Sequence, residues 1–349
     1  MTKRSLIMLG IGALISVGAI LLLFSQVELD AFAGHMRGAD QRYIAGMVAL
    51  YFVSTLLRGL RWQTVLVGKL TFWRGYHIVN VGFLLNAIFP FRLGELARVV
   101  LMSREPGQNA GSGLSAVALE RLLDSIFALL AVGLGLLLLP ERAALPPETT
   151  FTLGAVLVLA LVGVLVVLFL PSTHPLFLSI ARFFLKPLPD GLAARLLGFV
   201  QDTLEGLRVL ADPRRLAISL LASLVLWLTY YGYMQLGLYA FLGDAVPPLE
   251  VGLLILGFVA FGGAAPSLPG AVGIFQAAAV LALTTAGYDD TSLTTSYAWG
   301  IWVPQIMLLI TVGMVSLYVL GLSLVGLTRE VQAEMEQGSG ALSASAAAE

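Results

Sequence analysis

The chain contains several uncharged apolar runs that are long enough to cross a lipid bilayer as helices. A helix needs about 20 predominantly apolar residues to span the hydrocarbon core, and Ser5–Phe24 is the first such run. The other predicted full spans are Tyr43–Leu57, Ser125–Leu139 with a polar N-terminal extension, Phe151–Leu170, Leu216–Leu242 and about Trp299–Leu327. Because backbone groups in hydrocarbon must be hydrogen-bonded internally, these runs predict an all-α polytopic membrane protein with about six full spans.

The first run can be interpreted in two ways. Lys3 and Arg4 precede it, and Ala31-Phe32-Ala33 loosely resembles a cleavage site, so a signal peptide is one alternative. Its apolar core is longer than the roughly 7–15 residues of a signal-peptide core, which favours an uncleaved anchor helix.

Two other apolar segments contain breaks that a straight span would not carry. Gly75–Met102 has Pro90 near its middle, and Val251–Tyr288 has no charge over 38 residues but is interrupted by GGAAPSLPGAVG. The pieces around the second break are each about 15 residues long, so each reaches only about 23 Å of the ~30 Å hydrocarbon core. We therefore expect two re-entrant hairpins, buried in protein or lining a wet cavity.

The distribution of basic residues predicts the orientation of the chain. In this layout 16 of the 20 Lys and Arg residues lie on the cytoplasmic side, including Arg58 and Arg61, three lie outside, and Arg121 lies within a span. This asymmetry predicts a cytoplasmic N-terminus and a cytoplasmic C-terminus. Each half reads span, span, hairpin, span, so the second half is inverted relative to the first. Such an inverted repeat is typical of secondary transporters.

The rest of the organisation follows from composition. Residues 1–330 are expected to form one transmembrane domain, in which 171–215 is an amphipathic cytoplasmic or interfacial helical connector, and 331–349 is expected to be a disordered tail. The chain has no cysteine and only three histidines, all isolated, so we expect no metal site and no cofactor. No GxxxxGKS or GxxxxGKT nucleotide loop occurs, and nothing indicates a nucleic-acid partner.

Three charges follow the first predicted break. Arg92, Glu95 and Arg98 lie within seven residues of sequence, just after Pro90. A charge at the bilayer centre costs about 2.5–3.5 kcal/mol, so these side chains need partners or water. Helix-start N–H groups freed at Pro90 would favour an anion at the same place. The alternative is an interfacial helix whose arginines extend to cytoplasmic water.

A second charged cluster lies at the start of a predicted span, in the sequence ALERLLDSIF. Glu120 and Asp124 are four residues apart and share a helix face, so they repel each other unless a cation or a proton lies between them. Arg92, Arg98 or Arg121 could be that cation. The alternative to a functional site is a structural ion network that holds hairpin to helix.

The third candidate stretch is APSLPGAVGIFQ, in the second hairpin. Pro269, Gly270 and Gly273 give it a broken backbone, and Gln276 is one of its two side-chain hydrogen bonders. Glycines let the backbone approach a ligand or another helix closely. Tight packing at a kink is the alternative.

In this order and spacing, FPFRLGELAR, ALERLLD and PSLPGAVG resemble the lysylphosphatidylglycerol synthase transmembrane-region family, over about residues 8–326. That family includes the flippase half of bacterial multiple-peptide-resistance factors. The resemblance implies a flippase-like helical fold and polar-headed lipids as substrates. By motif match it points to Arg92, Gly94, Glu95, Arg98, Glu120, Arg121, Asp124, Pro269, Gly270 and Gly273.

Two departures from the family pattern change what is expected. Fused members carry a soluble aminoacyl-transferase domain after the membrane region, whereas this chain ends in a short tail, so lysyl-lipid synthesis is not expected. Gln276 stands where an acidic residue often occurs, which argues against proton coupling or cation recognition at that position.

The function expected from these features is translocation of a polar-headed, anionic phospholipid or lipid-linked intermediate across the bacterial cytoplasmic membrane. The arginines would hold a phosphate, and the carboxylates would orient them, bind a cationic head or exchange a proton. We expect no enzymatic activity. The alternatives are a membrane scaffold or accessory protein and a membrane enzyme acting on a lipid-linked substrate.

Overall fold

The computed structural model describes residues 3–65, 70–89, 93–108, 110–139, 213–242, 248–263 and 268–331, with isolated positions between 146 and 197 and at 333. The predicted span 151–170, the connector 171–215 and the tail 331–349 lie largely outside the described residues.

Four helices in the described ranges are long and apolar enough to cross a membrane. They are α3 (Gln41–Val65), α6 (Ala110–Leu138), α10 (Pro213–Leu242) and α13 (Thr291–Val319). The first two helices, α1 (Lys3–Phe24) and α2 (Leu29–Gly38), meet at a bend of 92° and count as a fifth span if taken together. The described part of the chain is therefore an all-helical, polytopic membrane protein.

Helix α3 is longer than the sequence pattern predicted. It continues beyond Leu57 and carries Arg58 and Arg61 inside a candidate span that ends at Thr64. Both arginines are buried, so the predicted end of the span at Leu57 is too early. A hydropathy pattern ends a span at a charge, whereas a charge that finds partners inside the protein can remain within the helix.

Helix α13 is shifted toward the N-terminus relative to its predicted range. It begins at Thr291 because the Asp290 carboxylate accepts a hydrogen bond from the Leu293 backbone N–H at 3.0 Å, which caps the helix. It ends at Val319, and Gly321 then adopts a φ of +67°, a conformation that glycine tolerates.

Two pairs of shorter helices occupy the places of the predicted hairpins. The first pair is α4 (Phe72–Ile88) with α5 (Leu93–Ser103), and the second is α11 (Leu249–Gly262) with α12 (Ile274–Thr285). Within each pair the two helices pack against each other across the predicted break.

Helices α4 and α5 approach closely through two glycines. A Cβ added to Gly94 would lie 1.7 Å from the carbonyl oxygen of Gly82, so no larger residue fits without moving a helix. The Asn86 side chain also accepts a hydrogen bond from the Gly94 N–H at 2.8 Å, which fixes the start of α5 against the end of α4.

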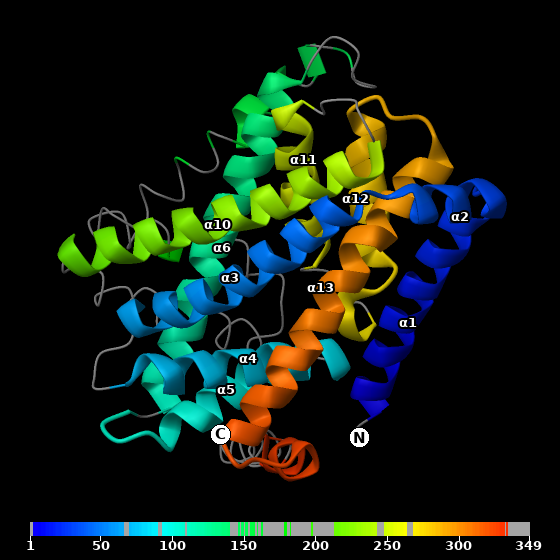
Figure 1. Cartoon of the computed structure of the whole chain (residues 1–349). Coiled ribbons are helices and arrows are strands. Elements are labelled where there is room, and N and C mark those ends of the chain that lie inside the picture. The colour runs from blue at the N-terminus through cyan, green and yellow to red at the C-terminus, as the bar shows by residue number, and fades with distance from the viewer. Residues whose placement is uncertain are drawn as a thin grey trace.

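Helices α3 and α10 form the most extensive helix pair among the described residues, and they lie side by side across the molecule (Figure 1). The contact is reciprocal, because each helix offers a glycine to a leucine of the other. A Cβ on Gly46 of α3 would lie 3.1 Å from Leu236, and a Cβ on Gly232 of α10 would lie 3.0 Å from Leu50. Small residues of this kind allow close helix approach in membranes.

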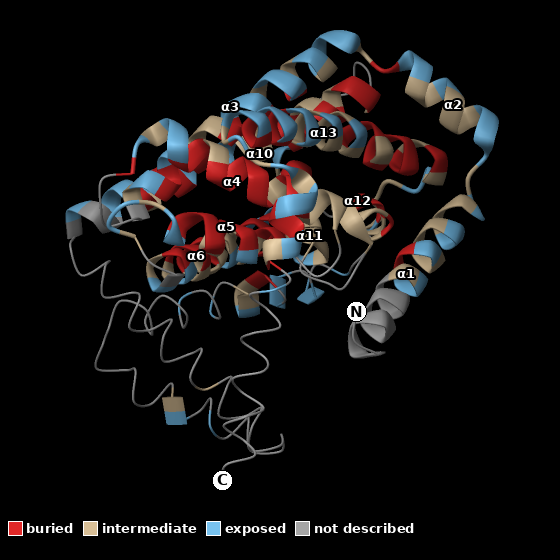
Figure 2. Ribbon diagram, turned by 90° about the horizontal axis from the view of Figure 1, so that it is seen from below, coloured by how far each residue is buried: buried red, intermediate tan, exposed pale blue. Residues whose placement is uncertain are grey.

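The remaining helices pack on this pair in two sets. Helix α6 contacts α5 and α11, and α13 contacts α12 and α4. Figure 2 shows that buried residues gather in α4, α5 and the neighbouring helices, whereas α2 at the edge has none. Outward-facing apolar side chains such as Leu14 and Leu22 of α1 are exposed, as expected for helices that face lipid.

Candidate functional site

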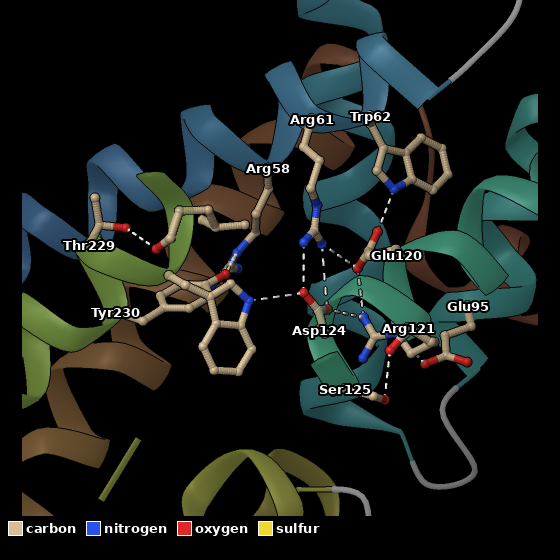
Figure 3. Close-up of polar contacts among 12 residues, drawn as sticks. Arg58, Arg61, Trp62, Glu95, Glu120, Arg121, Asp124, Ser125, Thr229 and Tyr230 are labelled. Atoms are coloured by element: carbon tan, nitrogen blue, oxygen red, sulfur yellow. Dashed lines mark hydrogen bonds and ion pairs between the residues drawn. The ribbon is translucent and has the colours of Figure 1, made fainter. Parts of the chain in front are cut away.

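Glu120 of α6 lies at the centre of a buried ion network (Figure 3). Its side chain is 2% exposed. Its Oε2 accepts a hydrogen bond from Nη1 of Arg98 at 2.7 Å and another from the indole N–H of Trp62, and its Oε1 accepts one from Nη2 of Arg121 at 2.6 Å. Helices α3, α5 and α6 are therefore tied together through one carboxylate.

Asp124 lies one turn further along α6 and has its own arginine. Nη1 of Arg61 donates to Asp124 Oδ1 at 2.6 Å, and Nη2 of Arg61 lies 3.5 Å from Oε1 of Glu120. The indole N–H of Trp227 on α10 also donates to Asp124, at 3.3 Å. Arg61 thus bridges the two carboxylates that share a face of α6.

The two carboxylates are neutralised by cations, as their spacing predicted, but Arg61 was not among the candidates. Hydropathy ended the span at Leu57, before Arg61, and the carboxylate that pairs with Arg61 lies 63 residues away in sequence. The signal that could have found it is the i, i+3 pair of Arg58 and Arg61 at the end of an apolar run, since both then lie on one helix face.

The network reaches the surface at Arg121 and Glu95. Nε of Arg121 lies 3.6 Å from Oε1 of Glu95, and these side chains are 38% and 24% exposed. The predicted site residues Glu95, Arg98, Glu120, Arg121 and Asp124 therefore come together in the structure. Arg92, with Pro90, lies outside the described residues.

Arg58 is held differently from the other arginines of the site. It is 5% exposed, its Nε donates to the phenol oxygen of Tyr230 at 2.7 Å, and its guanidinium carbon lies 4.4 Å from the ring centre of Phe83 and 5.1 Å from that of Tyr51. In the part of the chain that the structure describes, no carboxylate lies within ion-pair distance of Arg58.

Several guanidinium N–H groups in the cluster have no acceptor. Nε and Nη2 of Arg98 and Nε of Arg61 are buried without a hydrogen-bond partner. An unpaired buried donor costs roughly 1–3 kcal/mol. Among the described residues the site contains four arginines and three carboxylates, which leaves one excess positive charge. The members are Arg58, Arg61, Arg98, Arg121, Glu95, Glu120 and Asp124.

The third predicted stretch contacts other parts of the molecule. Gly270 has a φ of 70°, and its carbonyl accepts a hydrogen bond from the indole N–H of Trp302 on α13 at 2.9 Å. A Cβ on Gly270 would lie 3.6 Å from the carbonyl oxygen of Ala87, near the end of α4. Pro269, which begins this short turn, therefore lies close to the other helix break.

Gly273 and Gln276 serve the start of α12. Gln276 is fully buried, and its Oε1 accepts a hydrogen bond from the Gly273 N–H at 2.7 Å. Gly273 has a φ of 85°, and a Cβ there would lie 2.4 Å from the carbonyl oxygen of Ser16 on α1. Between described residues, no hydrogen bond or ion pair recorded for this stretch joins it to the charged cluster.

No group of three or more metal-ligating side chains is found within the described ranges. The donors that the site offers are guanidinium and indole N–H groups, which suit an anion.

Two comparisons with known proteins bear on this site. The profile of the family described as "Lysylphosphatidylglycerol synthase TM region" matches residues 9–313. The UPF0104 membrane protein PH1989 of Pyrococcus horikoshii is 25% identical over 245 residues, which cover 64% of this chain and 73% of that relative.

Proposed function

Because the chain belongs to the lysylphosphatidylglycerol synthase transmembrane-region family, we propose that it moves a polar-headed, anionic lipid between the two leaflets of the bacterial cytoplasmic membrane. The observation that carries this proposal is the cationic ion network buried among apolar helices. A translocator must shelter a polar headgroup while the acyl tails stay in lipid, and charged groups inside a membrane protein most often mark such a pathway.

The repeated arrangement of the helices supports the same mechanism. Helix α6 offers Gly135 to Leu254 of α11, with a Cβ-to-side-chain separation of 2.8 Å, and α13 offers Gly313 to Leu84 of α4, with a separation of 2.5 Å. In the proposed repeat, α3 corresponds to α10, α4–α5 to α11–α12, and α6 to α13. The contact of α6 with α11 in one half then corresponds to the contact of α13 with α4 in the other. An inverted repeat with paired broken helices is the usual frame of a binding site near the bilayer midplane.

The two helix breaks are then the moving parts. The turn at Gly270 lies against the end of α4, so described residues beside the two breaks are close together. Alternate opening of the α4–α5 and α11–α12 pairs would expose the site to one leaflet and then to the other. In this proposal both termini are cytoplasmic, as the basic residues predict.

A vesicle assay tests the proposal. The purified chain is reconstituted with phosphatidylglycerol that carries a fluorophore on its headgroup, and a membrane-impermeant quencher is added outside. Wild type should make the inner-leaflet pool accessible. Arg121→Gln should slow this exchange, whereas Arg74→Gln should not, because Arg74 lies outside the network and pairs with Glu105.

The outcomes separate the candidate functions. Fluorescence loss equal to that of protein-free vesicles would refute translocation and favour a scaffold. Activity that follows the amount of folded protein in every variant would also favour a scaffold. Chemical conversion of the lipid would indicate an enzyme.

A further inference from the structure

Arg58 stands apart from the other buried arginines because its partners are all neutral. Arg61, Arg98 and Arg121 each contact a carboxylate, whereas Arg58 contacts the phenol of Tyr230 and the rings of Tyr51 and Phe83. The phenol of Tyr230 accepts a hydrogen bond but carries no opposite charge. Arg58 therefore has no charged partner among the described residues.

The aromatic rings do not neutralise this charge. A desolvated cation–π contact stabilises a guanidinium by about 2 kcal/mol, but the ring carries no net charge, so the field of the cation remains. A buried charge without a counter-ion carries an effective penalty of several kcal/mol. A bound anion would remove that penalty and supply the missing acceptor atoms.

The guanidinium of Arg98 lies against the same ring as that of Arg58. The guanidinium carbons of Arg58 and Arg98 lie 4.4 and 5.3 Å from the ring centre of the same residue, Phe83. They are therefore no further apart than the sum of these two distances. Arg98 is fully buried, and its Nε and Nη2 have no acceptor. Two guanidinium groups thus lie around one phenyl ring: Arg98 has unused donors, and Arg58 has no counter-ion among the described residues.

The carboxylates of the site are already occupied. The two oxygens of Glu120 accept from Arg98, Trp62 and Arg121, and Asp124 accepts from Arg61 and Trp227. A cationic headgroup would have to displace these donors, whereas an oxyanion would meet donors that have no partner. The site is therefore selective for negative charge.

We propose that Arg58 and the free N–H groups of Arg98 hold a phosphate oxyanion beside Phe83, and that this phosphate belongs to the headgroup of the transported lipid. The planar guanidinium suits this task because it can donate two parallel hydrogen bonds to one phosphate. The assignment of the phosphate to a transported lipid rests on the proposed function, whereas the binding itself can be tested separately.

The test is a binding titration of the purified full chain in neutral detergent, followed by native mass spectrometry. The probes are phosphatidylglycerol, diacylglycerol with the same acyl chains, and inorganic phosphate. Wild type should retain phosphatidylglycerol and not diacylglycerol. Arg58→Gln should weaken phosphatidylglycerol binding about tenfold, because one charge-assisted contact is lost. The phosphatidylglycerol affinity of Arg58→Lys should fall between those of wild type and Arg58→Gln. The affinity of the exposed control Arg74→Gln should match that of wild type.

The phosphate arm identifies the source of the oxyanion. If inorganic phosphate competes with phosphatidylglycerol in wild type and not in Arg58→Gln, the site binds soluble phosphate as well as the lipid headgroup. If inorganic phosphate does not compete, the site binds the lipid headgroup alone. Equal phosphatidylglycerol affinity in wild type and a folded Arg58→Gln overturns the inference. If Arg58→Gln does not fold, equal retention of phosphatidylglycerol and diacylglycerol by wild type overturns it.

This experiment can fail independently of the vesicle assay. Phosphatidylglycerol binding that depends on Arg58 without any headgroup movement would support the oxyanion site and refute translocation. If Arg58→Gln moves the headgroup at the wild-type rate and binds phosphatidylglycerol with the wild-type affinity, translocation would be supported and the oxyanion site refuted.

Discussion

Replacing Glu120 with glutamine perturbs the ion network at its centre while keeping the size of the side chain. Glu120 contacts Arg61, Arg98 and Arg121, so its loss raises the excess charge of the described cluster from one to two. Removing one partner of a buried ion pair costs about 3–5 kcal/mol, because the other partner is left without compensation. We expect Glu120→Gln to lower the free energy of unfolding by that amount.

Removing an arginine of the network should lower the free energy of unfolding by less than removing Glu120. Arg98→Met keeps an unbranched apolar stem, removes the excess charge and removes two donor atoms that have no acceptor, while Glu120 keeps Arg61, Arg121 and Trp62. We expect a loss of about 1–2 kcal/mol. Because the double variant restores the original charge balance, its loss should fall below the sum of the single losses by about 1–3 kcal/mol.

The assay is reversible unfolding in mixed micelles, followed by tryptophan fluorescence and circular dichroism. Glu105→Gln is the matched control, because it removes the same charge from a pair whose arginine is 46% exposed, and we expect a loss of less than about 1 kcal/mol. A Glu120→Gln loss no larger than that of the control would refute the reasoning. Additive losses in the double variant, or a larger loss for Arg98→Met than for Glu120→Gln, would refute it as well.

Two further predictions concern glycines at helix contacts. Gly94→Ala should destabilise the α4–α5 pair by about 3 kcal/mol or more, since its Cβ would meet the Gly82 carbonyl, whereas Gly18→Ala, which has open space around it, should be neutral in the same unfolding assay. Gly273→Ala should loosen α1 from α12, because it combines a clash with Ser16 and a φ of 85°. The chain has no cysteine, so Ser16→Cys provides a single reporter: faster maleimide labelling in the Gly273→Ala background is expected, and an unchanged rate would count against the contact.

The sequence predicted the class of fold and the meeting of two charged motifs because both depend on local pattern. Apolar runs indicate spans wherever the bilayer is the solvent, and two carboxylates on one helix face require a cation. The arginine that bridges the two carboxylates, Arg61, could not be chosen from the sequence. Its burial depends on α6 lying beside α3, which is a tertiary contact that hydropathy does not contain.

The role of Gln276 was also outside the reach of the pattern. Its position after two glycines predicted a place near a ligand or a close packing site, and the structure uses its side-chain oxygen to cap α12 at Gly273. The same residues are compatible with either role until the backbone conformation at Gly273 is known. Arg92 and Pro90, at the first predicted break, lie outside the described residues.

The reciprocal contact of α3 and α10 has a mechanical consequence. Gly46 and Gly232 each receive a leucine of the other helix, and packed interiors of this kind rearrange between discrete states more readily than they stretch. Separating the two helices would break both glycine–leucine contacts, whereas a small rotation of one helix against the other would keep them. The α3–α10 contact is therefore expected to resist separation of the two helices more strongly than rotation of one helix against the other.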